Sequence, residues 1–229
     1  FIGYRHFVGR RLMKPFKRIF ESTAAVFAGL LIAALGSGCV TTGGGGTALF
    51  NGNDLAGWEV TDFAGGGAIE VKDGEIHIAM GELISGINLA HEDIPRTNYE
   101  LSAEAMKVDG SDFFCGLTFP VGDTYASFIP GGWGGTVVGL SSIDGMDAAE
   151  NETATFKNFE NNRWYRFRVR VTPIKIQCWV DDEMAVDLLL EDRAIALRPG
   201  PIELSVPIGI TSFQTVTRIR NVRLQPIAP

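Results

Sequence analysis

Apolar and polar residues alternate with a period of two in short segments between residues 48 and 227. In the clearest segment, residues 164–172, aromatic and β-branched residues alternate with Arg166, Arg168 and Arg170. Successive side chains of a β-strand point to opposite faces of the sheet. The pattern therefore predicts a strand that has one face in a core and the other in solvent or against a ligand.

Similar runs predict further strands, and turn dipeptides such as Asp73-Gly74, Asp109-Gly110 and Asp144-Gly145 separate some of them. Only residues 191–197 allow a short helix. Many short strands with long connections favour an all-β jelly-roll sandwich of two antiparallel sheets. The predicted strands cover residues 48–50, 58–60, 69–72, 75–79, 99–107, 113–120, 125–129, 136–142, 164–172, 175–180, 202–204, 208–212 and 216–224.

The first 38 residues have a different pattern, that of a signal peptide. A basic segment beginning at Met13 precedes an apolar run over residues 24–35, and small residues follow up to Cys39. The run of 12 residues is shorter than the roughly 20 that a transmembrane helix requires. We therefore predict a leader over residues 1–38, with translation starting at Met13, and export to the periplasm or cell surface.

Residues 35–39, Leu-Gly-Ser-Gly-Cys, resemble a bacterial lipobox. The resemblance implies lipidation of Cys39 and anchoring to a membrane through that lipid alone. The glycine-rich residues 39–47 would then form a tether, and residues 48–227 the sandwich domain. Plain cleavage beside an incidental cysteine is the alternative.

Charge and cysteine content narrow the classes of partner and cofactor. Beyond residue 38 the chain has 14 basic and 26 acidic residues, a net charge of −12, which disfavours nucleic-acid binding. Cys115 and Cys178 fall on core-facing positions and are expected to be buried free thiols, although export would permit a disulfide. No metal-ligand spacing occurs, so no cofactor is predicted. The acidic residues 144–152 are interpreted as an exposed loop, and the alternative is that their oxygens bind Ca²⁺.

Familiar catalytic motifs are absent from the sequence, but polar and aromatic residues predict a groove for a carbohydrate. There is no GxSxG elbow and no glutamate–aspartate–glutamate run of the glucanase type. A sugar needs an aromatic plane for its C–H face, and carboxylates or hydroxyls for its OH groups. The candidate catalytic carboxylates are Glu104 and Asp112, and the candidate substrate-binding residues are Phe114, Thr118, Ser127 and Trp133. The alternative is that the carboxylates are solvated and Trp133 only plugs a loop.

Several motifs carry a resemblance to one family. Residues 49–58, Leu-Phe-Asn-Gly-Asn-Asp-Leu-Ala-Gly-Trp, resemble the opening of the 3-keto-disaccharide hydrolase domain family. The resemblance continues through residues 73–76, 98–101, 162–165, 207–210 and 220–224, and so covers residues 48–227. It implies a concanavalin-like, laminarinase-like jelly roll on an exported lipoprotein, with activity on 3-keto-glycosides. Two family positions differ: residues 110–119 contain no arginine, and Cys178 stands where the family has histidine.

These observations lead to three hypotheses. The first is an enzyme that cleaves 3-keto-disaccharides or related glycosides, with Glu104 or Asp112 removing the proton that the ketone acidifies. The second is a non-catalytic glycan-binding or cell-surface interaction module, favoured by the missing arginine and histidine. A purely structural surface role is the third.

Overall fold

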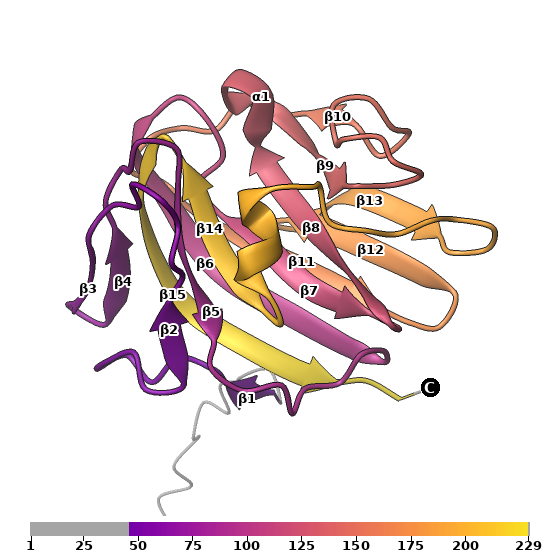
Figure 1. Cartoon of the computed structure of the whole chain (residues 1–229), viewed down its shortest axis with the longest axis horizontal. Coiled ribbons are helices and arrows are strands. Elements are labelled where there is room, and N and C mark those ends of the chain that lie inside the picture. Colours follow the sequence, from indigo (N-terminus) through magenta and orange to yellow (C-terminus); the bar gives the residue numbers. More distant parts are fainter. Residues whose placement is uncertain (1–45, 229) are drawn as a thin grey trace, which may run out of the picture. The chain divides into compact units, whose positions relative to one another are not determined.

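The computed structural model describes residues 46–228, which form two antiparallel β-sheets packed face to face (Figure 1). The predicted leader, its start at Met13 and the lipidation site Cys39 lie outside the described residues. No helix among residues 46–228 is long and apolar enough to cross a membrane. The predicted all-β sandwich of two antiparallel sheets is confirmed.

The larger sheet, here sheet A, contains the longest strands, β6 and β15, at its centre. Strand β1 (Thr47–Ala48) pairs with β15 outside the main path. The order across the sheet is β13 (Glu183–Leu189), β12 (Lys175–Val180), β11 (Trp164–Val171), β6 (Tyr99–Gly110), β15 (Thr215–Pro226), β4 (Glu75–Ile78) and β3 (Ile69–Lys72).

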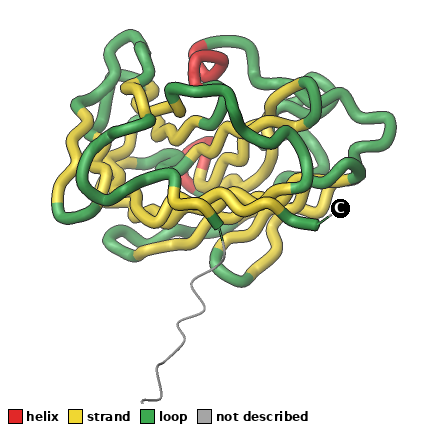
Figure 2. Tube along the Cα trace, turned by 90° about the horizontal axis from the view of Figure 1, so that it is seen from below, coloured by secondary structure: helices red, strands yellow, loops and turns green. Residues whose placement is uncertain are grey.

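The second sheet, sheet B, has seven strands and carries the candidate site on its outer face. Its order is β10 (Thr155–Phe156), β9 (Val137–Ser141), β8 (Thr124–Gly131), β7 (Gly116–Val121), β14 (Gly209–Phe213), β5 (Ile84–Leu89) and β2 (Trp58–Val60). Among the described residues, helical structure is confined to α1 (Gly132–Gly135) and the 3₁₀ helix η1 (Pro201–Ser205), the two red segments of Figure 2. The helix η1 packs over β5 and β14 (Figure 1).

The core lies between the sheets and follows the predicted alternation. On β11, Tyr165, Phe167 and Val169 are buried, whereas the arginines between them reach the outer face. The rings of Tyr165 and Phe167 join Phe114 and Phe159 in an edge-to-face cluster. Such aromatic pairs contribute about 0.5–1.5 kcal/mol beyond the burial of their area.

Both cysteines of the described domain are buried free thiols, as expected from their positions. Burial raises the pKa of the Cys115 thiol and that of Cys178, because the core disfavours the thiolate. Neither group can therefore act as a nucleophile at neutral pH.

The structure differs from the sequence prediction in several segments. Residues 202–204 form η1 instead of a strand, because Gly200 and Pro201 favour a helix start. Residues 191–197 contain no helix, and the strands β5, β10 and β13 were not predicted. In β5 the small residues Ser85 and Gly86 interrupt the apolar alternation that indicates a strand.

Candidate functional site

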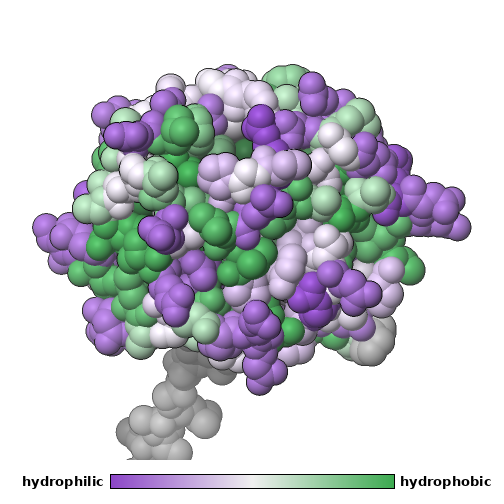
Figure 3. Space-filling view, viewed as in Figure 1, coloured by the Kyte–Doolittle hydropathy of each residue, from purple (hydrophilic) through white to green (hydrophobic). Residues whose placement is uncertain are grey.

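A groove of about 350 Å³ lies on the outer face of sheet B. We call it the sheet B groove. Its aromatic and cationic walls come from Phe113, Trp133, Phe213 and Arg198, and its polar floor from Ser127 and Ser141. In the space-filling view of this face, hydrophobic surface is surrounded by hydrophilic residues (Figure 3). An apolar cavity with a few convergent polar groups is typical of a small-molecule site.

Trp133 forms one wall and is held in an unusual backbone conformation. Its φ of 50° and ψ of 52° lie in the left-handed region, and Gly131 and Gly134 on either side also have positive φ. A non-glycine residue in this region costs about 1–3 kcal/mol, and such residues cluster at functional sites. Yet 40% of the Trp133 side chain is exposed. Core packing therefore does not account for this conformation.

Asp112 fixes the wall in place through two backbone hydrogen bonds. Its Oδ1 accepts from the Phe113 N–H at 2.8 Å, and its Oδ2 accepts from the Gly134 N–H at 2.9 Å. Asp112 also lines a smaller cavity of about 230 Å³ that shares Phe113, Trp133 and Arg198 with the sheet B groove. The Asp112 carboxylate thus connects Phe113 to the turn that carries Trp133, and it lies beside the cavity between these two rings.

The floor of the groove consists of neighbouring hydroxyl groups. Ser127 on β8 lies opposite Thr118 on β7, and their oxygens are 3.0 Å apart. The Thr118 oxygen is also 2.7 Å from that of Ser205, at the end of η1. Because Thr118 is fully buried, it supports Ser127 and η1 from beneath and does not itself face the groove.

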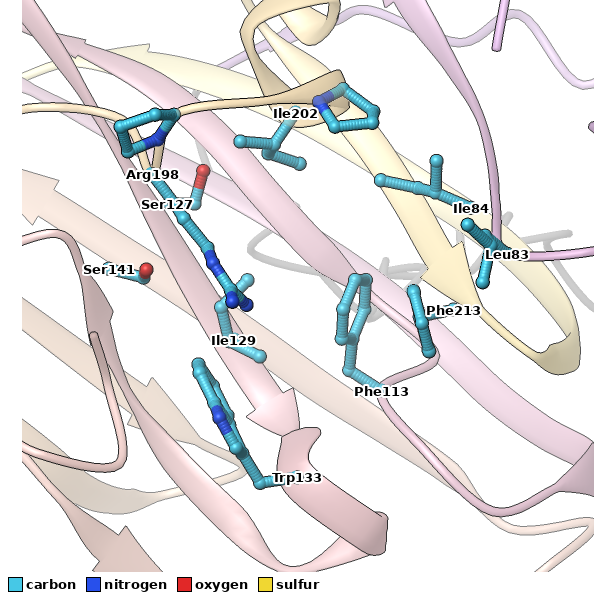
Figure 4. A pocket seen from close by; sticks show the side chains of 12 residues that line it. Leu83, Ile84, Phe113, Ser127, Ile129, Trp133, Ser141, Arg198, Ile202 and Phe213 are labelled. Atoms are coloured by element: carbon cyan, nitrogen blue, oxygen red, sulfur yellow. The ribbon is translucent and has the colours of Figure 1, made fainter. Parts of the chain in front are cut away.

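Arg198 enters the groove from the segment before η1, and its guanidinium points towards the space between Trp133 and Phe113 (Figure 4). Asp147 orients it: the Arg198 Nε lies 3.3 Å from Asp147 Oδ2, while Ser141 Oγ donates to Asp147 Oδ1 at 3.2 Å. The Arg198 guanidinium carbon lies 6.0 Å from the centre of the Trp133 ring. This cation is placed where it can donate to an oxygen of a bound ligand.

Arg198, Ser141 and Asp147 were not predicted as site residues. Arg198 and Asp147 lie in loops, where no periodicity reports the direction of a side chain. The only signal at Arg198 was its position before Pro199 and Pro201, which restrict the backbone.

Three of the predicted site residues line neither the sheet B groove nor the smaller cavity beside Asp112: Thr118 is buried beneath the groove, and Phe114 and Glu104 lie elsewhere. Phe114 is fully buried in the core cluster. Glu104 lies on β6 of sheet A, and its Oε2 accepts a hydrogen bond from Arg220 Nε at 2.8 Å. The prediction treated neighbouring strands along the chain as neighbours in space, but β6 and β7 belong to opposite sheets.

The acidic residues 144–152 are partly neutralised by arginine. Arg193 donates to Asp144 Oδ2 at 2.7 Å and also contacts Glu152. A hydrogen bond from the Ala194 N–H, together with Arg193, lowers the pKa of the Asp144 carboxyl from its ordinary value. Within residues 46–228, no group of three or more His, Cys, Asp or Glu side chains is arranged to hold a metal ion.

The two packed antiparallel sheets define a concanavalin-like jelly-roll sandwich. Residues 45–225 match the model of the 3-keto-alpha-glucoside-1,2-lyase-like domain, and the chain belongs to that family. The family resemblance found in the sequence is thereby confirmed, and it supports a glycan-related role. No curated protein matches the chain.

Solved structures show the same fold at low sequence identity. A β-glucanase from Bacillus licheniformis is 11% identical with a TM-score of 0.53, over 81% of this chain and all of that one. A structure from work on endo-acting O-glycanases of the human gut microbiota is 14% identical with a TM-score of 0.53, over 80% of this chain and all of that one. At these identities the likeness concerns the fold alone.

Proposed function

We propose that the protein is an exported lipoprotein that binds a 3-keto-glycoside in the sheet B groove and cleaves its glycosidic bond. One observation carries the proposal: the exposed Trp133 is held in a left-handed conformation beside Asp112 and Arg198. Family membership supports the substrate class. The acidic, exported domain would meet carbohydrates, and a lipid on Cys39 would anchor it to the membrane.

The groove offers each kind of contact that a sugar ring uses. The face of Trp133 suits the C–H side of a pyranose, and Phe113 and Phe213 form the opposite wall. Hydroxyls of Ser127 and Ser141 can exchange hydrogen bonds with the sugar OH groups. Arg198 donates to a carbonyl or enolate oxygen.

Cleavage follows from the acidity that the ketone gives to its neighbouring carbon. Asp112 accepts the proton from C2 of the sugar, and the C2 electron pair forms the C1–C2 double bond. The C1–O bond breaks, and its electrons leave with the aglycone oxygen, which takes a proton from water. As charge builds up on the keto oxygen, the Arg198 guanidinium stabilises it. Water adding later across the double bond would complete a hydrolysis.

A glycan-binding role without catalysis is the second candidate. It is favoured because both oxygens of Asp112 already accept backbone hydrogen bonds. The same groove would then bind the sugar without turning it over.

The test is to incubate the purified protein with 3-keto-trehalose and follow release of the aglycone sugar. We expect turnover in the parent, a loss of at least 100-fold in Asp112→Asn, and retained turnover in Glu104→Gln, since Glu104 lies on the other sheet. Saturable binding without product in the parent would establish the binding module instead. Full turnover in Asp112→Asn would refute the assigned base.

A further inference from the structure

A second cavity, of about 600 Å³, lies on the outer face of sheet A, away from the sheet B groove. Strands β11, β6 and β15 form its floor, and side chains opposite one another make three cross-strand rows. We call them the arginine rows. They are Arg166–Glu104–Arg220, Arg168–Ser102–Arg223 and Arg170–Glu100–Gln225.

The middle row differs from the other two in its central residue. In the outer rows a glutamate binds arginine: Glu104 accepts from Arg220 Nε at 2.8 Å, and Glu100 from Arg170 Nη2 at 2.9 Å. In the middle row the neutral Ser102 lies between Arg168 and Arg223. Side chains opposite one another in such pairs begin about 4.5–5.5 Å apart. The side chains of Arg168 and Arg223 therefore start on either side of a position that has no carboxylate in its row, and Arg223 Nη2 also donates to the Gly46 carbonyl at 2.9 Å.

Arg168 has a donor that the described residues leave unused. Its Nε is buried and has no hydrogen-bond partner within residues 46–228. Its Nη1 reaches Glu100 Oε2 at 3.3 Å, and its guanidinium stacks on Trp179 at 4.1 Å. A buried donor without a partner costs about 1–3 kcal/mol, which an acceptor oxygen from a ligand would recover.

Charge around the cavity favours a negative ligand. The cavity itself is lined by three arginines and three carboxylates, and Arg170 and Arg220 of the outer rows add two positive charges beside it. The whole chain has a net charge of −7. Each carboxylate is already paired with an arginine, Asp182 with Arg166. The arginine rows and the cavity lining together therefore carry an excess of two positive charges in an otherwise acidic protein.

The backbone of β15 also changes course beside the cavity. Its register with β6 shifts between Arg220 and Arg223, and Asn221 within this bulge has a φ of 52°. The bulge places Asn221 on the cavity wall with Gln225. Bulges often redirect a side chain towards a site. Both amides can bond to hydroxyl groups.

We propose that this cavity binds a sugar that carries an oxyanion, such as the carboxylate of a uronic acid or a sulfate ester. The oxyanion lies over Ser102 between Arg168 and Arg223, the place that glutamate occupies in the neighbouring rows. It accepts the Nε–H of Arg168, and Asn221 and Gln225 bond to the ring hydroxyls. The site is separate from the sheet B groove and does not depend on the proposed catalysis.

The test is a titration of the purified protein with glucuronate at low ionic strength, followed by tryptophan fluorescence, because Trp179 stacks on Arg168. We expect saturable binding to the parent and no binding of the neutral methyl glucoside at this site. Ser102→Glu places a carboxylate in the middle row, so affinity should fall at least tenfold while the unfolding midpoint stays unchanged. Arg168→Gln should weaken binding to a similar extent.

The matched control is Arg218→Gln, because Arg218 also lies on β15 but faces Glu75 outside the cavity. It should bind like the parent. Absence of glucuronate binding, or unchanged affinity in both Ser102→Glu and Arg168→Gln, overturns the proposal. Equal affinity for inorganic sulfate, or binding to phosphatidylglycerol vesicles but not to glucuronate, overturns its sugar component. Activity at the sheet B groove should be equal in all these variants.

Discussion

The carboxylate of Asp112 accepts the backbone N–H of Gly134 at 2.9 Å, although 22 residues separate the two in the sequence. This hydrogen bond joins the segment before β7 to the turn that carries Trp133. The same carboxylate also accepts the N–H of Phe113. The two aromatic walls of the sheet B groove thus share one anchor, and a change at Asp112 affects positioning as well as chemistry.

The two effects of Asp112 can be separated by substitution. Asp112→Asn keeps one acceptor oxygen, so we expect sugar affinity to change less than threefold while any turnover falls at least 100-fold. Asp112→Ala removes both acceptors and should also weaken sugar binding tenfold or more, because a lost charged hydrogen bond costs about 1.5–3 kcal/mol. Calorimetric titration with a non-reactive glycoside, alongside turnover, measures both. Equal affinity in the two variants would contradict a positioning role.

The left-handed backbone at Trp133 is expected to lower the stability of the fold, while its ring contributes to sugar binding. Trp133→Gly removes the aromatic plane but fits the left-handed backbone at φ 50° without strain. We expect the free energy of unfolding to stay within about 1 kcal/mol of the parent or to rise, and sugar affinity to fall at least tenfold. Urea denaturation and ligand titration provide the two values. A large loss of stability would show that Trp133 is a structural plug.

The buried thiols should make the domain less stable in alkali. Folding raises the pKa of Cys115 and Cys178 above the ordinary value of about 8.5, so the folded state retains protons that the unfolded state loses. Their stabilising contribution is complete below that pH and declines above it, by about 1.4 kcal/mol per pH unit for each thiol. Denaturation between pH 8 and 10 measures this slope. The double variant Cys115→Ala, Cys178→Ala should have a shallower one.

The sequence predicted the fold well because period-two alternation reports which side chains face the core. It predicted Ser127 and Trp133 in a groove, and the structure brings them together. It could not predict that β6 and β7 belong to opposite sheets, which separates Glu104 from the groove. The sequence also could not predict that the Arg198 side chain enters the groove, because the position of this side chain depends on its ion pair with Asp147 and on the path of a loop.

Phe114 was predicted as a substrate-binding residue, but residues 111–115 are irregular and the alternation of a strand does not apply to them. As a result, Phe113 lines the groove while Phe114 lies in the core.

The different environments of Phe113 and Phe114 yield a prediction for these two adjacent residues. Phe114→Ala should destabilise the fold by about 3–5 kcal/mol, because it leaves a cavity among Phe159, Tyr165 and Phe167. Phe113→Ala should cost much less stability but weaken sugar binding, because its ring forms the groove wall against Phe213. Thermal unfolding and glycan titration of the two single variants distinguish these roles. If Phe114→Leu, which largely preserves the core, reduced affinity more than Phe113→Leu did, the placement of the groove would be refuted.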